Sequence, residues 1–338
     1  MADAVFTSTT TPTGVTSEMM TYYDKVFLER AQMMMKYDIL CDKKTVPANS
    51  GKVVYFTRQT KFTPITAALT EPTDLASSVY SGVGFSAETV SATLAPYGRA
   101  ERISTFFAKT TIDAGLKEKV STMGQFAGES LDTMIRNGIY NGLSASSTVK
   151  DADMRQFAGD ARDFSANQWT SVTSTCTLTI DELRRAVVFL KRNKAPQWEN
   201  GMYRAVVPTQ GIYELQGDTT TGANWANTNI YNSAENAELV KKGVIGRLAG
   251  IDIFESNNEK IDASGASAID VYHTFVAGKG AFGVVDLSGQ GKPKLIHKTS
   301  GNSDTSNPLD MYETLSWKIE GWAFATLNPA FAIDIIHA

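Results

Sequence analysis

The last third of the chain constrains the fold most, because three β-rich segments follow one another there with turn residues between them. The segments span residues 243–258, 275–287 and 316–336, and no catalytic residue type is grouped among them. Segments of this kind are typical of strands joined by turns. We therefore expect the C-terminal third to build a sheet and not a reaction site.

The third of these segments has the clearest strand pattern. Its apolar and polar residues alternate, which is the period of a strand with one buried face. The expected buried face is Trp317, Ile319, Ala323, Ala325 and Leu327, and the polar residues between them are Lys318, Glu320 and Thr326. Asn328-Pro329 then interrupts the strand, and apolar residues resume at Phe331, Ile333 and Ile335.

A long amphipathic helix is predicted upstream, over about thirty residues. Its apolar face is Ile112, Leu116, Val120, Met123, Ala127, Leu131, Ile135 and Ile139. Its opposite face is expected to be solvated and contains Lys117, Glu118, Lys119, Glu129, Asp132 and Arg136. Gly138 and Gly142 are expected to stop it. At ~1.5 Å per residue such a helix is a rod of roughly 45 Å.

Residues 51–103 predict two strands that are far apart in sequence. Val53 and Tyr55 alternate with polar residues, as do Val90, Ala92 and Leu94 on the return, and the stretch between carries Pro64, Pro72, Gly82 and Gly84. A two-stranded hairpin alone is marginal in water. We therefore expect this hairpin to lie on a second molecule. In a monomer, the apolar side chains of Val53, Tyr55, Val90 and Leu94 are expected to be exposed to solvent.

The remaining elements complete an α+β pattern. Residues 1–16 indicate an extended arm, 16–31 a helix, 143–178 an irregular connection, 202–215 a strand followed by a short helix, and 234–242 another helix. Thr179 and Glu182 form a capping box for a further helix. We expect the long helix to lie against antiparallel strands, with a second lobe inserted between about residues 150 and 290.

Length, composition and charge exclude several classes of protein. The 338 residues are enough for two domains, and 42% hydrophobic with 20% charged residues is typical of a globular protein. The net charge of -4 argues against a surface built to neutralise phosphates. The N-terminus lacks the regions of a signal peptide, and no apolar run approaches the ~20 residues that cross a bilayer, so we expect a cytoplasmic protein without membrane contact.

Candidate chemical sites are few. Residues 278–283 spell G-x-G-x-x-G, the pattern of a dinucleotide site, but a strand and not a helix is expected after it. His273, His297 and His337 are isolated, and we expect single surface or sheet histidines. Cys41 and Cys176 predict buried or half-buried thiols. An acidic loop of Asp151, Asp153, Asp160 and Asp163 is expected to be solvated and not a calcium site. No catalytic, cofactor-binding or metal-ligating residue is predicted.

Several strings resemble those of the major capsid proteins of tailed bacteriophages, in the group typified by the large coliphage N-four capsid protein. They are residues 16–31, 51–56, 69–72, 131–137 and 202–215, together with the three C-terminal segments. The resemblance implies the Hong Kong 97 type of shell fold. It implies an N-terminal arm and helix (1–50), an extended hairpin loop (51–103), a peripheral domain with a spine helix (104–150 and 288–338) and an axial domain (151–287).

The resemblance also implies a function. Such a chain self-assembles as hexamers and pentamers into the icosahedral head around double-stranded DNA, which it contacts non-specifically. Its partners would be portal and scaffolding proteins and a decoration protein, and its place the virion, assembled in the host bacterial cytoplasm. The short stretch before the first helix predicts a separate scaffolding protein. In some shells of this fold a lysine crosslinks to a neighbour, and Lys61 lies on the extended loop, although an ordinary solvated lysine is expected.

Two alternative functions remain for the chain. They are an encapsulin-like shell with enzyme cargo and a nucleotide-binding oxidoreductase at residues 278–283.

Overall fold

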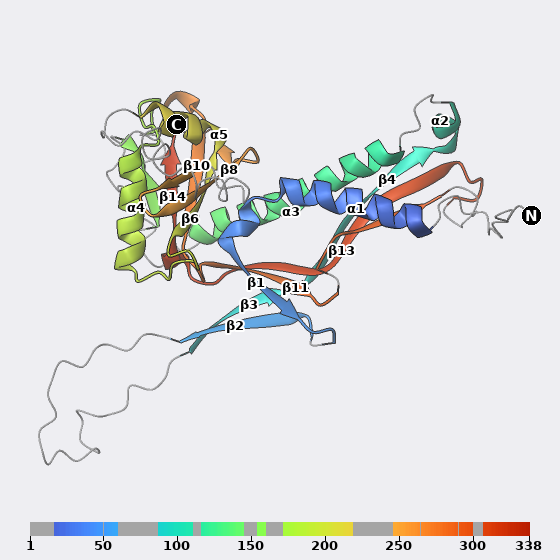
Figure 1. The fold of residues 1–338 in the computed structure, drawn as a ribbon, viewed down its shortest axis with the longest axis horizontal. Coiled ribbons are helices and arrows are strands. Elements are labelled where there is room, and N and C mark those ends of the chain that lie inside the picture. The colour runs from blue at the N-terminus through green and yellow to red at the C-terminus, as the bar shows by residue number, and fades with distance from the viewer. Residues whose placement is uncertain are drawn as a thin grey trace, which may run out of the picture.

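The computed structural model describes residues 17–49, 51–59, 87–110, 116–144, 154–159, 172–218, 246–263, 265–289, 291–299 and 307–338. Within these ranges the molecule is elongated, with a lobe at one end and a pair of long helices running from it along a second sheet (Figure 1). The predicted α+β class is confirmed. The N-terminal arm, the helix at 234–242, Lys61 and the four aspartates of the acidic loop lie outside the described residues.

The two long helices lie side by side (Figure 1). They are α1 (Ser17–Met34) and α3 (Leu116–Ser144). Gly124 and Gly128 of α3 face the backbone of α1, and a Cβ at Gly124 would lie 2.5 Å from the carbonyl oxygen of Phe27. Because glycine has no side chain at these points, the two helix backbones can approach closely and bury Phe27 and Ala31 between them.

The predicted apolar face of α3 is confirmed from Val120 to Ile139, where every residue of the pattern is buried. Two predictions for this helix are wrong. Gly138 and Gly142 do not end it, because they lie where α3 crosses a strand, and a Cβ at Gly138 would lie 2.5 Å from the ring of Phe324. Asp132 is not on a solvated face but fully buried, for reasons given below.

Among the described residues, one sheet has five strands. They are β1 (Cys41–Val46), β4 (Ala95–Ser104), β11 (Phe282–Leu287), β12 (Lys294–Lys298) and β13 (Tyr312–Thr326). β13 lies at the centre: its first part pairs with β4 and β12 and its second part with β11, which in turn pairs with β1 in parallel.

A β-bulge in β13 changes which residues face the helices. The register shifts between Ile319 and Trp322, and Gly321 has a φ of +72°. One extra residue reverses the side on which the following residues point. Trp317, Ile319 and Trp322 therefore share the core under α3, whereas Ala323 and Ala325 lie in a second core on the opposite face. The prediction of one continuous buried face is wrong for that reason.

The second core lies under the hairpin of β2 (Val53–Gln59) and β3 (Ala87–Thr93). Val54 pairs with Ala92, and both are buried against Val285 and Ala323 of the five-stranded sheet. Leu94 is buried as well, and Val90 is half-buried. The expectation that Val90 and Leu94 stay wet is therefore wrong, because the root of the hairpin packs on its own chain.

The lobe contains a larger sheet, of seven strands among the described residues. They are β5 (Arg155–Phe157), β6 (Tyr203–Pro208), β7 (Gly246–Leu248), β8 (Ile251–Ser256), β9 (Ile261–Asp262), β10 (Val271–Ala277) and β14 (Ala332–His337). The order is β5-β14-β10-β6-β8-β7, with β9 on β10. The strands predicted within residues 202–215 and 243–258 lie in this sheet, as does β10, whereas β11 joins the five-stranded sheet. β14 completes the sheet of the lobe although it lies within the range 288–338 predicted for the peripheral domain.

Two helices cover one face of this sheet, α4 (Ile180–Arg192) and α5 (Thr209–Gly217). Leu183, Leu190 and Leu215 pack there against the strands. The predicted cap is confirmed at the start of α4, since the Thr179 hydroxyl accepts from the backbone N–H of Glu182. The other face of the sheet, with Phe275 and Phe254, belongs to the core under α3. The short helices η1 (Tyr37–Leu40), α2 (Thr105–Thr110), η6 (Ala266–Ala268) and η7 (Pro329–Phe331) lie in the connections.

Candidate functional site

The outward face of the hairpin is the first candidate surface. Val53 and Tyr55 point away from the core that Val54 and Leu94 help to fill, and they are 40% and 61% exposed. Tyr55 lies opposite Ser91 and Val53 opposite Thr93, so the two apolar side chains stand in a polar surround. The prediction for these two residues is confirmed. A second molecule that covers Val53 and Tyr55 would remove their apolar surface from water.

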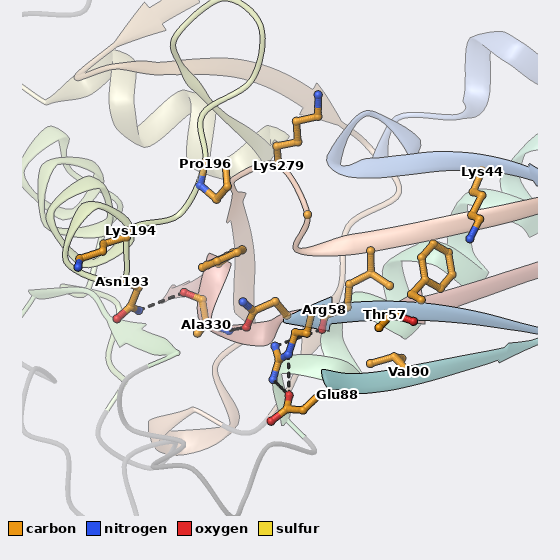
Figure 2. A pocket seen from close by; sticks show the side chains of 15 residues that line it. Lys44, Thr57, Arg58, Glu88, Val90, Asn193, Lys194, Pro196, Lys279 and Ala330 are labelled. Carbon is orange, nitrogen blue, oxygen red and sulfur yellow. Dashed lines mark hydrogen bonds and ion pairs between the residues drawn. The ribbon is translucent and has the colours of Figure 1, made fainter. Parts of the chain in front are cut away.

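A groove of about 890 Å³ lies between the hairpin and the lobe (Figure 2). Phe56, Leu327 and Phe331 supply apolar lining, while Lys44, Lys194 and Lys279 add positive charge. On the hairpin side Arg58 forms an ion pair with Glu88 and donates to the carbonyl oxygen of Leu327 at 3.4 Å. On the lobe side the Asn193 amide donates to the carbonyl oxygen of Ala330 at 3.1 Å. These hydrogen bonds fix the side chain of Arg58 in one wall of the groove and that of Asn193 in the other.

An apolar tip at the far end of the molecule is the second exposed surface. We define it as Phe106 and Phe107 of α2 with Leu309 and Met311 beside the start of β13. Phe106 is 76% and Leu309 79% exposed. The backbone N–H and the hydroxyl of Thr105 both donate to the carbonyl oxygen of Met311, at 2.9 and 3.1 Å, which fixes the two parts of the tip together. The sequence pattern did not identify this surface, although the adjacent phenylalanines were a signal.

The glycines of residues 278–283 do not form a dinucleotide site. They connect β10 to β11, and the chain continues as a strand from Phe282, so no helix begins at these glycines. Gly280 has a φ of +81° in the turn. A Cβ at Gly278 would lie 2.7 Å from the carbonyl oxygen of Pro196. These glycines serve a tight turn and a close backbone contact, as the strand–turn–strand alternative predicted.

The histidines are sheet residues, as predicted, but they are not on the surface. His273 and His337 are fully buried, each beside a carboxylate: Nδ1 of His273 is 2.8 Å from Asp334, and Nδ1 of His337 is 3.0 Å from Glu214. His297 lies 3.7 Å from Glu313. Cys41 and Cys176 are buried free thiols, as predicted.

Neither a metal cluster nor a membrane-spanning helix is found in the described ranges. There, no three His, Cys, Asp or Glu side chains are grouped so as to hold a metal ion. In the part of the chain that the structure describes, no helix is both long and apolar enough to cross a bilayer. Among the residues that the structure describes, the surfaces that stand out by their geometry are the hairpin face, the groove and the tip.

The long helix on a central sheet, the hairpin projecting from it and the lobe at one end define a capsid fold of the Hong Kong 97 type, as found in tailed bacteriophages. The fold prediction is confirmed. No protein-family profile matches the chain, and no curated protein matches its sequence. The narrower group around the coliphage N-four capsid protein stays a prediction.

Three of the similar solved structures are phage capsids. The capsid of Ralstonia phage GP4 aligns with a TM-score of 0.65 at 16% identity, over 88% of this chain and 87% of that one. The capsid asymmetric unit of cyanophage Pam1 aligns at 0.62 and 14%, over 93% of both chains. The capsid of cyanophage P-SCSP1u aligns at 0.59 and 17%, over 90% and 88%. At sequence identities of 14–17%, these similarities establish the fold alone.

Proposed function

We propose that this chain is the major capsid protein of a tailed bacteriophage, a structural subunit and not an enzyme. The observation that carries the proposal is the hairpin, which projects from a phage-capsid fold and exposes Val53 and Tyr55 on its outward face. In a lone subunit the exposure of these apolar side chains to water is unfavourable in free energy. A neighbouring copy that covers the hairpin face recovers part of the apolar burial, at about 25 cal/mol per Å².

Assembly follows from many such contacts. Each subunit offers its hairpin to one neighbour, and the copies close into hexamers and pentamers of a shell. The contacts are individually modest, but the area summed over a shell is large. We assign residues 1–50 to the arm and first helix, 51–103 to the hairpin loop, 104–150 and 288–338 to a peripheral domain and 151–287 to an axial domain.

The contents and partners of the shell are further parts of the proposal. A net charge of -4 suits a container that does not hold its DNA by phosphate neutralisation, and contact with the genome is then non-specific. Portal and scaffolding proteins, and a decoration protein, are the expected partners. The subunit would end in the virion after assembly in the host bacterial cytoplasm.

Electron microscopy of the purified protein, with and without a coexpressed scaffolding protein, tests the proposal. We expect shells from the natural sequence and from Tyr55→Phe, which keeps the ring. Tyr55→Asp places a charge in the covered face, so we expect subunits that keep the thermal unfolding temperature but no longer assemble.

Two results would count against the proposal. If Tyr55→Asp assembles as well as Tyr55→Phe, the hairpin face is not an assembly contact. If the natural sequence stays monomeric at high concentration with the hairpin resistant to proteases, the chain is not a shell subunit. Shells that contain a co-purified enzyme and no DNA would favour the encapsulated-enzyme alternative.

A further inference from the structure

A polar stripe on α3 fastens this helix to the lobe. Asp132, Arg136 and Tyr140 follow one another at intervals of four residues and therefore lie along one side of the helix. All three bind residues 256–262, the segment that leads from β8 through β9. This contact is independent of the exposed surfaces on which the proposed function depends.

Each member of the polar stripe has a defined partner in that segment. Asn258 donates to Asp132 Oδ2 at 2.9 Å. Arg136 Nη1 donates to the side-chain oxygen of Asn258 at 2.9 Å and to the carbonyl oxygen of Glu259 at 2.8 Å. Tyr140 donates its hydroxyl proton to Asp262 Oδ2 at 2.9 Å.

Asp262 in turn is held by His273 of β10. Nε2 of His273 lies 3.4 Å from Asp262 Oδ2, and Nδ1 lies 2.8 Å from Asp334 Oδ2 on β14. The imidazole is fully buried, and its ring meets the edge of Tyr140 at a centroid distance of 5.1 Å. One buried histidine thus contacts carboxylates from two strands and an aromatic ring from α3.

Two cations complete the charged groups around this histidine. Lys260, beside β9, pairs with Asp262 and lies 5.0 Å from the centre of the Tyr140 ring. Arg155 of β5 lies 5.7 Å from the same ring. The titratable and charged groups that face His273 are therefore Tyr140 from α3, Arg155 from β5, Lys260 and Asp262 from β9 and its approach, and Asp334 from β14.

Only a protonated imidazole directs an N–H group at each of the two carboxylates, in a hydrogen bond of 2.8 Å to Asp334 and an ion pair of 3.4 Å to Asp262. The imidazolium carries a proton on each ring nitrogen, whereas the neutral ring carries one proton and presents a lone pair at the other nitrogen. A neutral His273 would turn that lone pair toward the half-buried Asp262 or the buried Asp334, and a lone pair facing a carboxylate in such a site is unfavourable. We propose that His273 and the polar stripe of α3 form a pH-sensitive joint, closed while the imidazole is protonated and loosened when it becomes neutral.

The electrostatics of the site agree with this geometry. Burial by itself would lower the pKa of His273, but Asp334 and Asp262 together raise it to about 9. The His273 contact also holds the pKa of Asp262 well below its usual range, with help from Lys260 and Tyr140. Since the folded pKa of His273 lies above the unfolded value of about 6.5, its stabilisation is complete below about pH 6.5 and is lost as the pH rises through about 9.

The test compares two buried histidines of the same sheet. His337 is as buried as His273 and also contacts a carboxylate, Glu214, but its described contacts do not include α3. We expect the unfolding temperature of the full chain to fall between pH 6.5 and 9.5. His273→Gln should remove much of this fall, because glutamine does not titrate, and His337→Gln should leave it in place.

Hydrogen exchange locates the effect. After correction for the intrinsic rate, we expect residues 256–262 to exchange faster as the pH passes 9, while the paired part of β13 stays protected. In His273→Gln these residues should exchange faster already at pH 7. Equal pH slopes for wild type and His273→Gln would overturn the proposal, as would loss of the slope in His337→Gln.

Asp262→Asn keeps the proposal testable if His273→Gln does not fold. Removing one of the two carboxylates lowers the pKa of His273, so the fall in unfolding temperature should move to lower pH. An unshifted fall in Asp262→Asn would contradict the joint. Because the measurements use unfolding and exchange within the subunit, they do not depend on whether shells form.

Discussion

Asp132 connects three parts of the chain that are distant in sequence. Besides its contact with Asn258, its Oδ1 accepts from the backbone N–H groups of Lys36 and Tyr37, at 2.7 and 2.8 Å. These donors lie at the start of η1, where the chain leaves α1. One buried carboxylate therefore fixes the turn after α1, the middle of α3 and the segment after β8.

Replacing Asp132 by Ala is expected to lower the free energy of unfolding by about 3 kcal/mol or more, because each buried donor left without a partner costs about 1–3 kcal/mol. Denaturant unfolding of the purified subunit measures the loss. Glu129→Ala is the control on the same helix, since Glu129 is exposed and its loss should stay within about 0.5 kcal/mol. Equal effects of the two variants would mean that the Asp132 contacts do not stabilise the fold.

The sequence could not assign Asp132 and Arg136 correctly. The helical period separates an apolar side from a polar side, and these two residues fall on the polar side with Lys117 and Glu118. Asp132 differs from those residues in its partner, Asn258, which lies 126 positions later in the chain. A period within one helix contains no information on such a distant contact. The apolar side was predictable because burial of apolar residues needs no specific partner.

At the scale of elements, the bulge in β13 gives one strand two buried faces. Before Gly321 the residues Trp317 and Ile319 face the core under α3. After it Trp322 faces that core, while the alternate residues Ala323 and Ala325 fit under the hairpin. An isolated glycine within a strand pattern is itself a signal for a bulge. The alternation of apolar residues predicted the strand, and this glycine was the sign that the alternation changes face.

We expect Gly321→Ala to destabilise the subunit more than Gly250→Ala. Both glycines have positive φ, at +72° and +86°, so either alanine is strained by about 1–2 kcal/mol. A Cβ at Gly321 would also lie 2.9 Å from Cβ of Leu287, whereas at Gly250 nothing lies within 4 Å. Thermal unfolding of the two variants measures the difference, and equal losses would show that the contact with Leu287 is not limiting.

At the scale of the whole molecule, the exposed apolar surfaces lie far apart. The groove lies between the hairpin and the lobe, and α2, which carries Phe106 and Phe107 of the apolar tip, lies at the opposite end of the long helices (Figure 1). A subunit with separate apolar surfaces can contact several neighbours at once, which a closed shell requires. The fold class was predictable through resemblance, but the tip was not, because its two parts are about two hundred residues apart in sequence.

The double variant Phe106→Ser with Leu309→Ser tests the tip as an assembly contact. We expect it to fold with little change in unfolding temperature, since both side chains are exposed, and to yield smaller assemblies by light scattering and electron microscopy. Val188→Ser, at an exposed apolar residue of α4 in the lobe, is the control and should assemble normally. Normal shells from the double variant would remove the tip from the set of assembly contacts.

The position of β13 in the sheet has a consequence for how the chain is made. β4 ends at Ser104, and the strand that pairs with it begins only at Tyr312. At a synthesis rate of about 5–20 residues per second, roughly 10–40 s separate the two. During that time the inner face of α3 and the underside of the hairpin have no sheet to cover them. We therefore expect the nascent chain to depend on ribosome-associated chaperones until β13 has been synthesised.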